Sequence, residues 1–121
     1  MIIEEHDAGK VTVLEITGAL TLDSGGELRD AVQRVLTRQR CQILINLAQV
    51  TYVDSCGLGE ILQAYVSLRR RGGHLKLLKV TPQCRQLLTV AKLLTVLEIF
   101  ESEPMALRSF PANTVPMRQM N

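Results

Sequence analysis

The chain has 121 residues, which is enough for one domain with a single hydrophobic core and too little for two. Hydrophobic residues make up 46% and aromatic residues only 3%, so the core is expected to be aliphatic, with no aromatic surface on which nucleobases could stack. A net charge of +2 is too small and too scattered to indicate nucleic acid binding.

The N-terminal part of the chain predicts two strands joined by a turn. Residues 1–5 are expected to form a short edge strand, and residues 6–10 a turn that contains Gly9. The next segment, Val11–Thr17, is apolar on both of its faces and carries several β-branched residues. Such a strand belongs near the middle of a sheet, and residues 18–21 are expected to leave it.

A helix and a third strand are expected next. Ser24 and Glu27 have the spacing of a capping box, in which each side chain satisfies a free backbone donor of the other residue. The apolar residues that follow at helical spacing are Leu28, Val32, Val35 and Leu36. Cys41–Leu47 has the composition of a buried strand, and residues 48–52 lead from it into a turn.

In the second half of the chain, helix and strand alternate. The expected elements are a helix from the turn to about Arg71, a strand over 75–80, a helix that starts at Thr81-Pro82, a short strand over 97–100 and a helix from Ser102 to about Phe110. Each strand–helix–strand unit requires a right-handed crossover between parallel strands, so the fold class is α/β. We expect one domain over residues 1–110 and a disordered tail over 111–121, which has two prolines and no periodic pattern.

Nothing in the sequence indicates secretion, membrane insertion or a bound metal. Residues 1–3 are followed at once by polar residues, and the apolar region 87–100 is interrupted by Thr, Lys and Glu. The three cysteines are widely spaced and odd in number: Cys41, Cys56 and Cys84. We therefore expect a cytoplasmic protein with reduced thiols, no metal site and no cofactor.

The turn Val53-Asp54-Ser55-Cys56-Gly57-Leu58-Gly59 is the most informative stretch of the sequence. It joins a buried strand to a helix, and it places Asp54 and Ser55 where the helix needs its N-cap. The Ser55 hydroxyl is then expected at the positive end of the helix dipole, which favours a phosphate. The simpler interpretation is that both residues only cap the helix.

This string resembles the phosphorylation site of the STAS domain family, the anti-sigma factor antagonists of bacteria, whose motif reads Asp-Ser-(Ser/small)-Gly-Leu-Gly. The resemblance runs from about Val11 to about Leu107. It implies a mixed sheet of about five strands that starts antiparallel, four helices packed against it, and Ser55 as the phosphoacceptor. It also implies two partners, namely an anti-sigma factor serine kinase of the histidine-kinase-like ATPase type and a serine phosphatase. The unphosphorylated protein would sequester the anti-sigma factor and so regulate transcription.

The resemblance places the partner contacts on the turn and on the first turns of the helix. The candidates are Asp54, Ser55, Cys56, Gly57, Leu58, Gly59, Glu60 and Gln63. Many relatives have an acidic residue near the serine in a Gly-x-Leu-Asp string, but here Thr21 stands at that position, and Asp23 is the candidate replacement. Cys56 occupies the small-residue position and is expected to point into the core; the alternative is a redox-sensitive thiol at the helix N-terminus. The glycines are expected to let the helix approach neighbouring backbone closely.

Two other functions are compatible with the sequence. A STAS protein can serve as an accessory subunit of a stress-sensing or lipid-transport complex, with Ser55 never modified. An enzyme with Ser55 or Cys56 as nucleophile would need a base, but neither His6 nor His74 has a recognisable partner. Ser55 also lacks the Gly-x-Ser-x-Gly elbow of hydrolases, so a non-enzymatic binding module is favoured.

Overall fold

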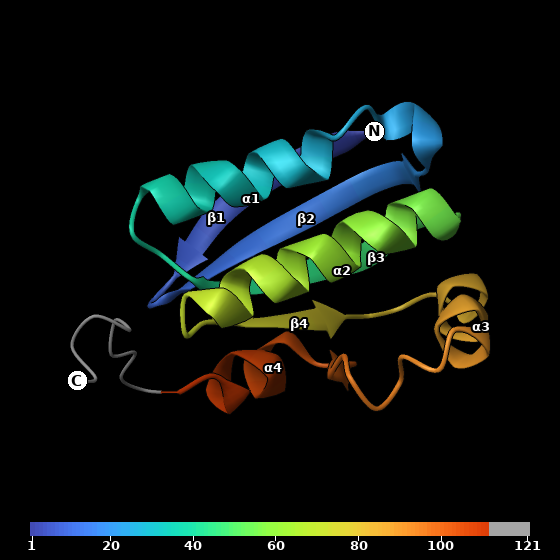
Figure 1. The fold of residues 1–121 in the computed structure, drawn as a ribbon. Coiled ribbons are helices and arrows are strands. Elements are labelled where there is room, and N and C mark those ends of the chain that lie inside the picture. The colour runs from blue at the N-terminus through green and yellow to red at the C-terminus, as the bar shows by residue number, and fades with distance from the viewer. Residues whose placement is uncertain (112–121) are drawn as a thin grey trace.

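The computed structural model describes residues 1–111 and consists of a five-stranded sheet with helices packed on it (Figure 1). The elements are β1 Ile2–Ala8, β2 Val11–Leu20, the 3-10 helix η1 Leu22–Ser24, α1 Glu27–Thr37, β3 Gln42–Val53, α2 Ser55–Arg70, β4 His74–Leu78, α3 Pro82–Val90, β5 Ile99–Phe100 and α4 Glu103–Ser109. The strands lie in sequence order, with β1 antiparallel to β2 and every later pair parallel. The predicted α/β class, mixed sheet and four helices are confirmed. Apart from Pro111, the tail predicted over 111–121 lies outside the described residues.

The first three strands are longer than the sequence pattern predicted. β1 continues through residues 6–8, which had been expected in a turn, and pairs with β2 along its whole length. Its charged residues suit an edge strand, because charge discourages pairing with further chains, but they hide the strand from a hydrophobicity pattern. β2 and β3 continue to Leu20 and Val53, with register shifts near Glu15 and Gly18 that break the alternation expected of a strand.

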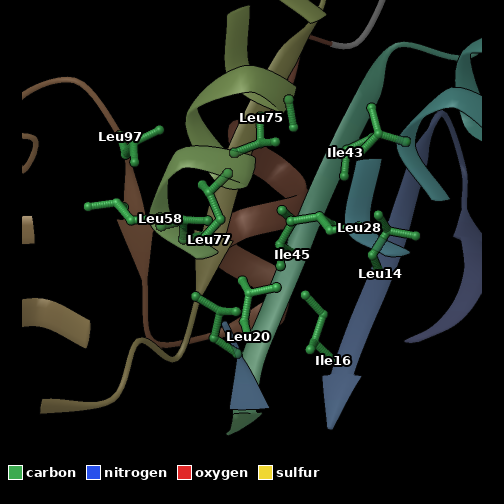
Figure 2. Close-up of a cluster of buried hydrophobic side chains, with 14 of the residues drawn as sticks. Leu14, Ile16, Leu20, Leu28, Ile43, Ile45, Leu58, Leu75, Leu77 and Leu97 are labelled. Atoms are coloured by element: carbon green, nitrogen blue, oxygen red, sulfur yellow. The ribbon is translucent and has the colours of Figure 1, made fainter. Parts of the chain in front are cut away.

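The apolar side chains of the strands alternate between two cores, one on each face of the sheet. The larger core lies under α1 and α2 and contains residues such as Leu14, Ile45, Leu58 and Leu77 (Figure 2). The smaller core lies on the opposite face, where α4 packs against the strand side chains that point away from α1 and α2. Its buried members are Val11, Val13, Leu44, Leu78, Ala106 and Phe110. The core is therefore almost wholly aliphatic, as the composition predicted.

Three of the four predicted helix starts are correct, that of α2 at Asp54 among them, and one is wrong. Thr81 and Ser102 cap α3 and α4 as expected, each with its side chain accepting from a backbone N–H of the first helical turn. The predicted capping box of Ser24 and Glu27 does not form. Ser24 instead completes a capping box with Thr21 around η1. Gly26, with φ +78°, precedes α1 without any side-chain cap.

An ion-pair cluster ties β1 to the C-terminal end of α1, at the opposite end of the strands from α2's first residue. The Arg38 guanidinium donates to the carboxylates of Glu5 and Asp7, each at 3.0 Å. This contact with Arg38 lowers the pKa of Asp7 to about 2.

No helix within residues 1–111 combines the length and the apolar character needed to cross a bilayer.

Candidate functional site

The predicted strand–turn–helix is present, and it lies at the carboxyl end of β3. Val53 is the last residue of β3 and pairs with Leu20, the last residue of β2. Asp54 is the N-cap of α2, and Ser55 is its first helical residue. The turn therefore lies where two parallel strands end together, beside η1, the position at which open α/β sheets commonly carry their functional sites (Figure 1).

Asp54 does more than cap the helix. One carboxylate oxygen, Oδ1, accepts from the backbone N–H of Gly57 at 2.8 Å, as expected of an N-cap. The other, Oδ2, accepts from the backbone N–H of Leu22 at 3.0 Å, and the Asp54 N–H donates to the Leu20 carbonyl at 3.2 Å. Asp54 thus connects α2 to η1 and to β2. These backbone donors, first that of Gly57, hold the pKa of Asp54 below its ordinary value.

We expect the Asp54→Asn variant to show a flatter acid dependence of stability than the parent. Because the pKa of Asp54 is lower in the folded state, its ionised form stabilises the fold above the unfolded-state pKa of about 3.9, and this contribution is lost as the pH falls below it. Urea unfolding at a series of pH values from about 7 to about 3 measures the slope. Asp7→Asn is the matched comparison, because Asp7 contributes with the same sign from the other end of the sheet. An unchanged slope in Asp54→Asn would contradict this role.

Ser55 and Cys56 are both exposed on the first turn of α2. The expectation that Cys56 points into the core is wrong. Gly57 and Leu58 occupy the inward positions of this turn, so the two residues before them face outward. The hydroxyl of Ser55 and the thiol of Cys56 therefore lie side by side at the helix N-terminus. Because Ser55 is exposed, another protein can reach its hydroxyl.

The close-approach explanation holds for one glycine of the motif and fails for the other. A Cβ on Gly57 would overlap the carbonyl oxygen of Leu20 and would lie 2.7 Å from its carbonyl carbon. A Cβ on Gly59 would meet no atom within 4 Å. Gly57 is therefore needed for α2 to pack against the end of β2, whereas Gly59 leaves the surface open beside Ser55.

The segment in which Thr21 stands at the position of the acidic residue of Gly-x-Leu-Asp lies next to the turn. The Thr21 hydroxyl accepts from the Asp23 N–H at 3.3 Å, so this side chain caps η1. Asp23 is exposed, as the candidate replacement for the acidic residue must be. Between them, Leu22 donates its backbone N–H to Asp54, and the residue is 72% exposed. The sequence analysis missed Leu22; an apolar residue in an otherwise polar turn was the available signal.

The two contact candidates further along α2 face a groove between α1 and α2. Its volume is about 410 Å³, and its lining includes Arg29 and Gln33 of α1 and Glu60, Gln63 and Arg70 of α2. The Glu60 oxygen Oε1 is buried there and has no hydrogen-bond partner among residues 1–111. Glu60 and Gln63 therefore belong to a surface that extends from the Ser55 turn along α2.

The histidines lie away from this site. His6 is exposed on the edge strand β1, and His74 begins β4, where its Nδ1 lies 3.0 Å from Gln42 Oε1. Burial lowers the pKa of His74. Within residues 1–111, no three His, Cys, Asp or Glu side chains are grouped as metal ligands. Within residues 1–111 the turn presents an exposed serine next to an aspartate that is bound to backbone N–H groups, and neither histidine lies beside this serine.

Several known proteins are similar to this chain in sequence or in fold. The family model of the STAS domain matches residues 3–106. An anti-sigma F factor antagonist from Paenibacillus polymyxa is 29% identical over 104 residues, which cover 85% of this chain and 88% of that protein. The fold is similar to the crystal structure of an anti-sigma factor antagonist from Mycobacterium paratuberculosis, with a TM-score of 0.80 at 19% identity over 90% of this chain and 92% of that one. It is also similar to the Bacillus cell fate determinant SpoIIAA in its phosphorylated form, with a TM-score of 0.71 at 18% identity over 88% and 97% of the two chains. The chain belongs to the STAS domain family.

Proposed function

We propose that this protein is an anti-sigma factor antagonist, a binding module rather than an enzyme, whose binding is switched by phosphorylation of Ser55. The single observation that carries the proposal is the exposed Ser55 at the start of α2, held in place by the hydrogen bonds of Asp54. Support comes from the sequence relative named as an anti-sigma F factor antagonist. The structural relative described in a phosphorylated form adds to it.

The contact surface consists of exposed and half-buried residues around the turn. Leu22 supplies apolar area, Ser55 and Cys56 supply small neutral groups, and Gly59 leaves space for a close approach. A partner that covers this surface removes water from it. A phosphate on Ser55 adds about 1.5 to 2 negative charges next to Asp54, so the covered surface becomes strongly anionic and the partner is released.

The isolated domain tolerates the same phosphate. Ser55 is exposed, so the group remains solvated, and the positive end of the α2 dipole favours negative charge. Phosphorylation therefore changes binding while leaving the fold unchanged. The chain supplies the serine, and the partner kinase, a serine kinase of the histidine-kinase-like ATPase type, supplies ATP and Mg²⁺. A serine phosphatase restores the binding form, and we place the cycle in the cytoplasm.

The test is intact-mass measurement after incubation with the cognate anti-sigma factor and Mg-ATP. We expect one phosphate on the parent, none on Ser55→Ala, and one on Ser67→Ala, a control on the same helix. A parent protein that binds the anti-sigma factor but is never modified would refute the switch. Recovery of the chain with a transport or stress-sensing assembly, again with Ser55 unmodified, would favour the accessory-subunit function instead.

A further inference from the structure

The strand that carries the phosphoacceptor turn extends well past its neighbour. β3 continues to Val53, but its pairing with β4 ends at Asn46, opposite Leu78. From residue 47 onward, the edge of β3 that faces away from β2 has no strand beside it within residues 1–111. Buried backbone groups on such an edge need other partners, and Val53 is fully buried.

A side chain of α3 takes the place of the missing strand. The Gln83 amide Nε2 donates to the Val53 carbonyl at 2.8 Å, and the Gln83 oxygen Oε1 accepts from the Val53 N–H at 3.0 Å. The carboxamide thereby satisfies both polar groups of one residue, as a neighbouring peptide group would. Val53 is the last residue of β3 and is followed directly by Asp54. Gln83 therefore holds the residue from which the turn begins.

The turn is therefore held from two sides. Asp54 connects it to Leu20 and Leu22 on the β2 side, and Gln83 connects it to α3 on the β4 side. Removing either set of hydrogen bonds frees the backbone beside Ser55 without touching the serine itself. A kinase transfers phosphate only to a hydroxyl that it can align, and a misplacement of about 1 Å can reduce a rate by about 100-fold.

We propose that Gln83 is a positioning residue for phosphorylation: its carboxamide fixes the end of β3 and so sets the place of the Ser55 hydroxyl. This inference rests on the proposed function. It assigns a role in the switch to α3, a helix that carries none of the motif residues. A purely structural role, in which Gln83 only attaches α3 to the sheet, would change stability and leave the phosphorylation kinetics of the folded protein unchanged.

The test compares the parent with Gln83→Leu, which keeps the size of the side chain and loses both hydrogen bonds, and with Gln83→Glu, which keeps only the acceptor. Gln86→Leu, an exposed position on the same helix, is the control. Steady-state phosphorylation by the cognate kinase gives kcat and KM, and amide hydrogen exchange reports on the Val53 N–H. We expect Gln83→Leu to lower kcat about tenfold with little change in KM and to speed exchange at Val53, Gln83→Glu to lie between, and Gln86→Leu to match the parent.

Two failures can be told apart. A parent-like kcat in Gln83→Leu, or an equal loss in Gln86→Leu, would overturn the role of Gln83 while leaving the switch intact. A parent that receives no phosphate would overturn the switch, and the positioning role with it. Thermal unfolding of each variant ensures that the rates refer to folded protein.

Discussion

The Ser55→Asp variant is expected to bind the cognate anti-sigma factor at least about tenfold more weakly than Ser55→Asn, which has the same size and no charge. One unpaired charge on a surface that the partner must dehydrate costs about 1.4 kcal/mol or more, and each 1.4 kcal/mol is tenfold in the dissociation constant. Phosphoserine carries about twice the charge, so its effect should reach about 100-fold. Isothermal titration calorimetry with the purified partner measures all three forms.

The stability of these variants shows whether the effect is local. A carboxylate at the first position of α2 interacts favourably with the helix dipole, by about 0.3 to 1 kcal/mol, so Ser55→Asp should unfold no more easily than the parent. Ser55→Ala should bind as the parent does and resist the kinase. If Ser55→Asp and Ser55→Ala both bound like the parent, the electrostatic switch would be disproved.

The Gly57→Ala variant is expected to lose about 3 kcal/mol of its free energy of unfolding. The added methyl group would overlap the Leu20 carbonyl, and a backbone group in a paired strand cannot move aside as a flexible side chain would. A loss of this size is a large part of the stability of a small domain. In urea it should lower the unfolding midpoint by about 1 to 2 M.

Gly59→Ala is the matched control, two residues further along the same helix. Its methyl group meets no atom within 4 Å, and alanine favours a helix over glycine by about 1 kcal/mol, so this variant should be as stable as the parent or more stable. Equal destabilisation by both substitutions would mean that α2 does not pack against β2 as described. Loss of partner binding by the stable Gly59→Ala variant would support the proposed place of Gly59 in the contact surface.

Local patterns in the sequence were sufficient for the fold class and for the centre of the site. Apolar residues at helical spacing identified α1 and α2, and the Asp-Ser-x-Gly-Leu-Gly string identified the N-cap and the exposed serine. These features depend on residues within a few positions of each other. The same is true of Thr81-Pro82, where cap and first helical residue are adjacent.

The features that the sequence did not predict depend on contacts between distant residues. The hydrogen bond from Leu22 to Asp54 spans 32 positions, and those between Val53 and Gln83 span 30. No local pattern indicates that a glutamine side chain will complete a sheet edge. Cys56 was misplaced for a related reason: which residues of the first turn of α2 face inward depends on how the helix is rotated against the sheet.

Because Cys56 is exposed, its thiol offers a selective labelling site next to Ser55. Cys84 is buried and Cys41 half-buried, and burial raises the pKa of both thiols, which slows their alkylation. A maleimide or iodoacetamide reagent should therefore react first at Cys56 in the native protein. The product is an uncharged adduct one residue from Ser55. A series of labels of increasing size would show how steric bulk at this position affects partner binding without any change in charge. A fluorescent label would report partner binding in real time.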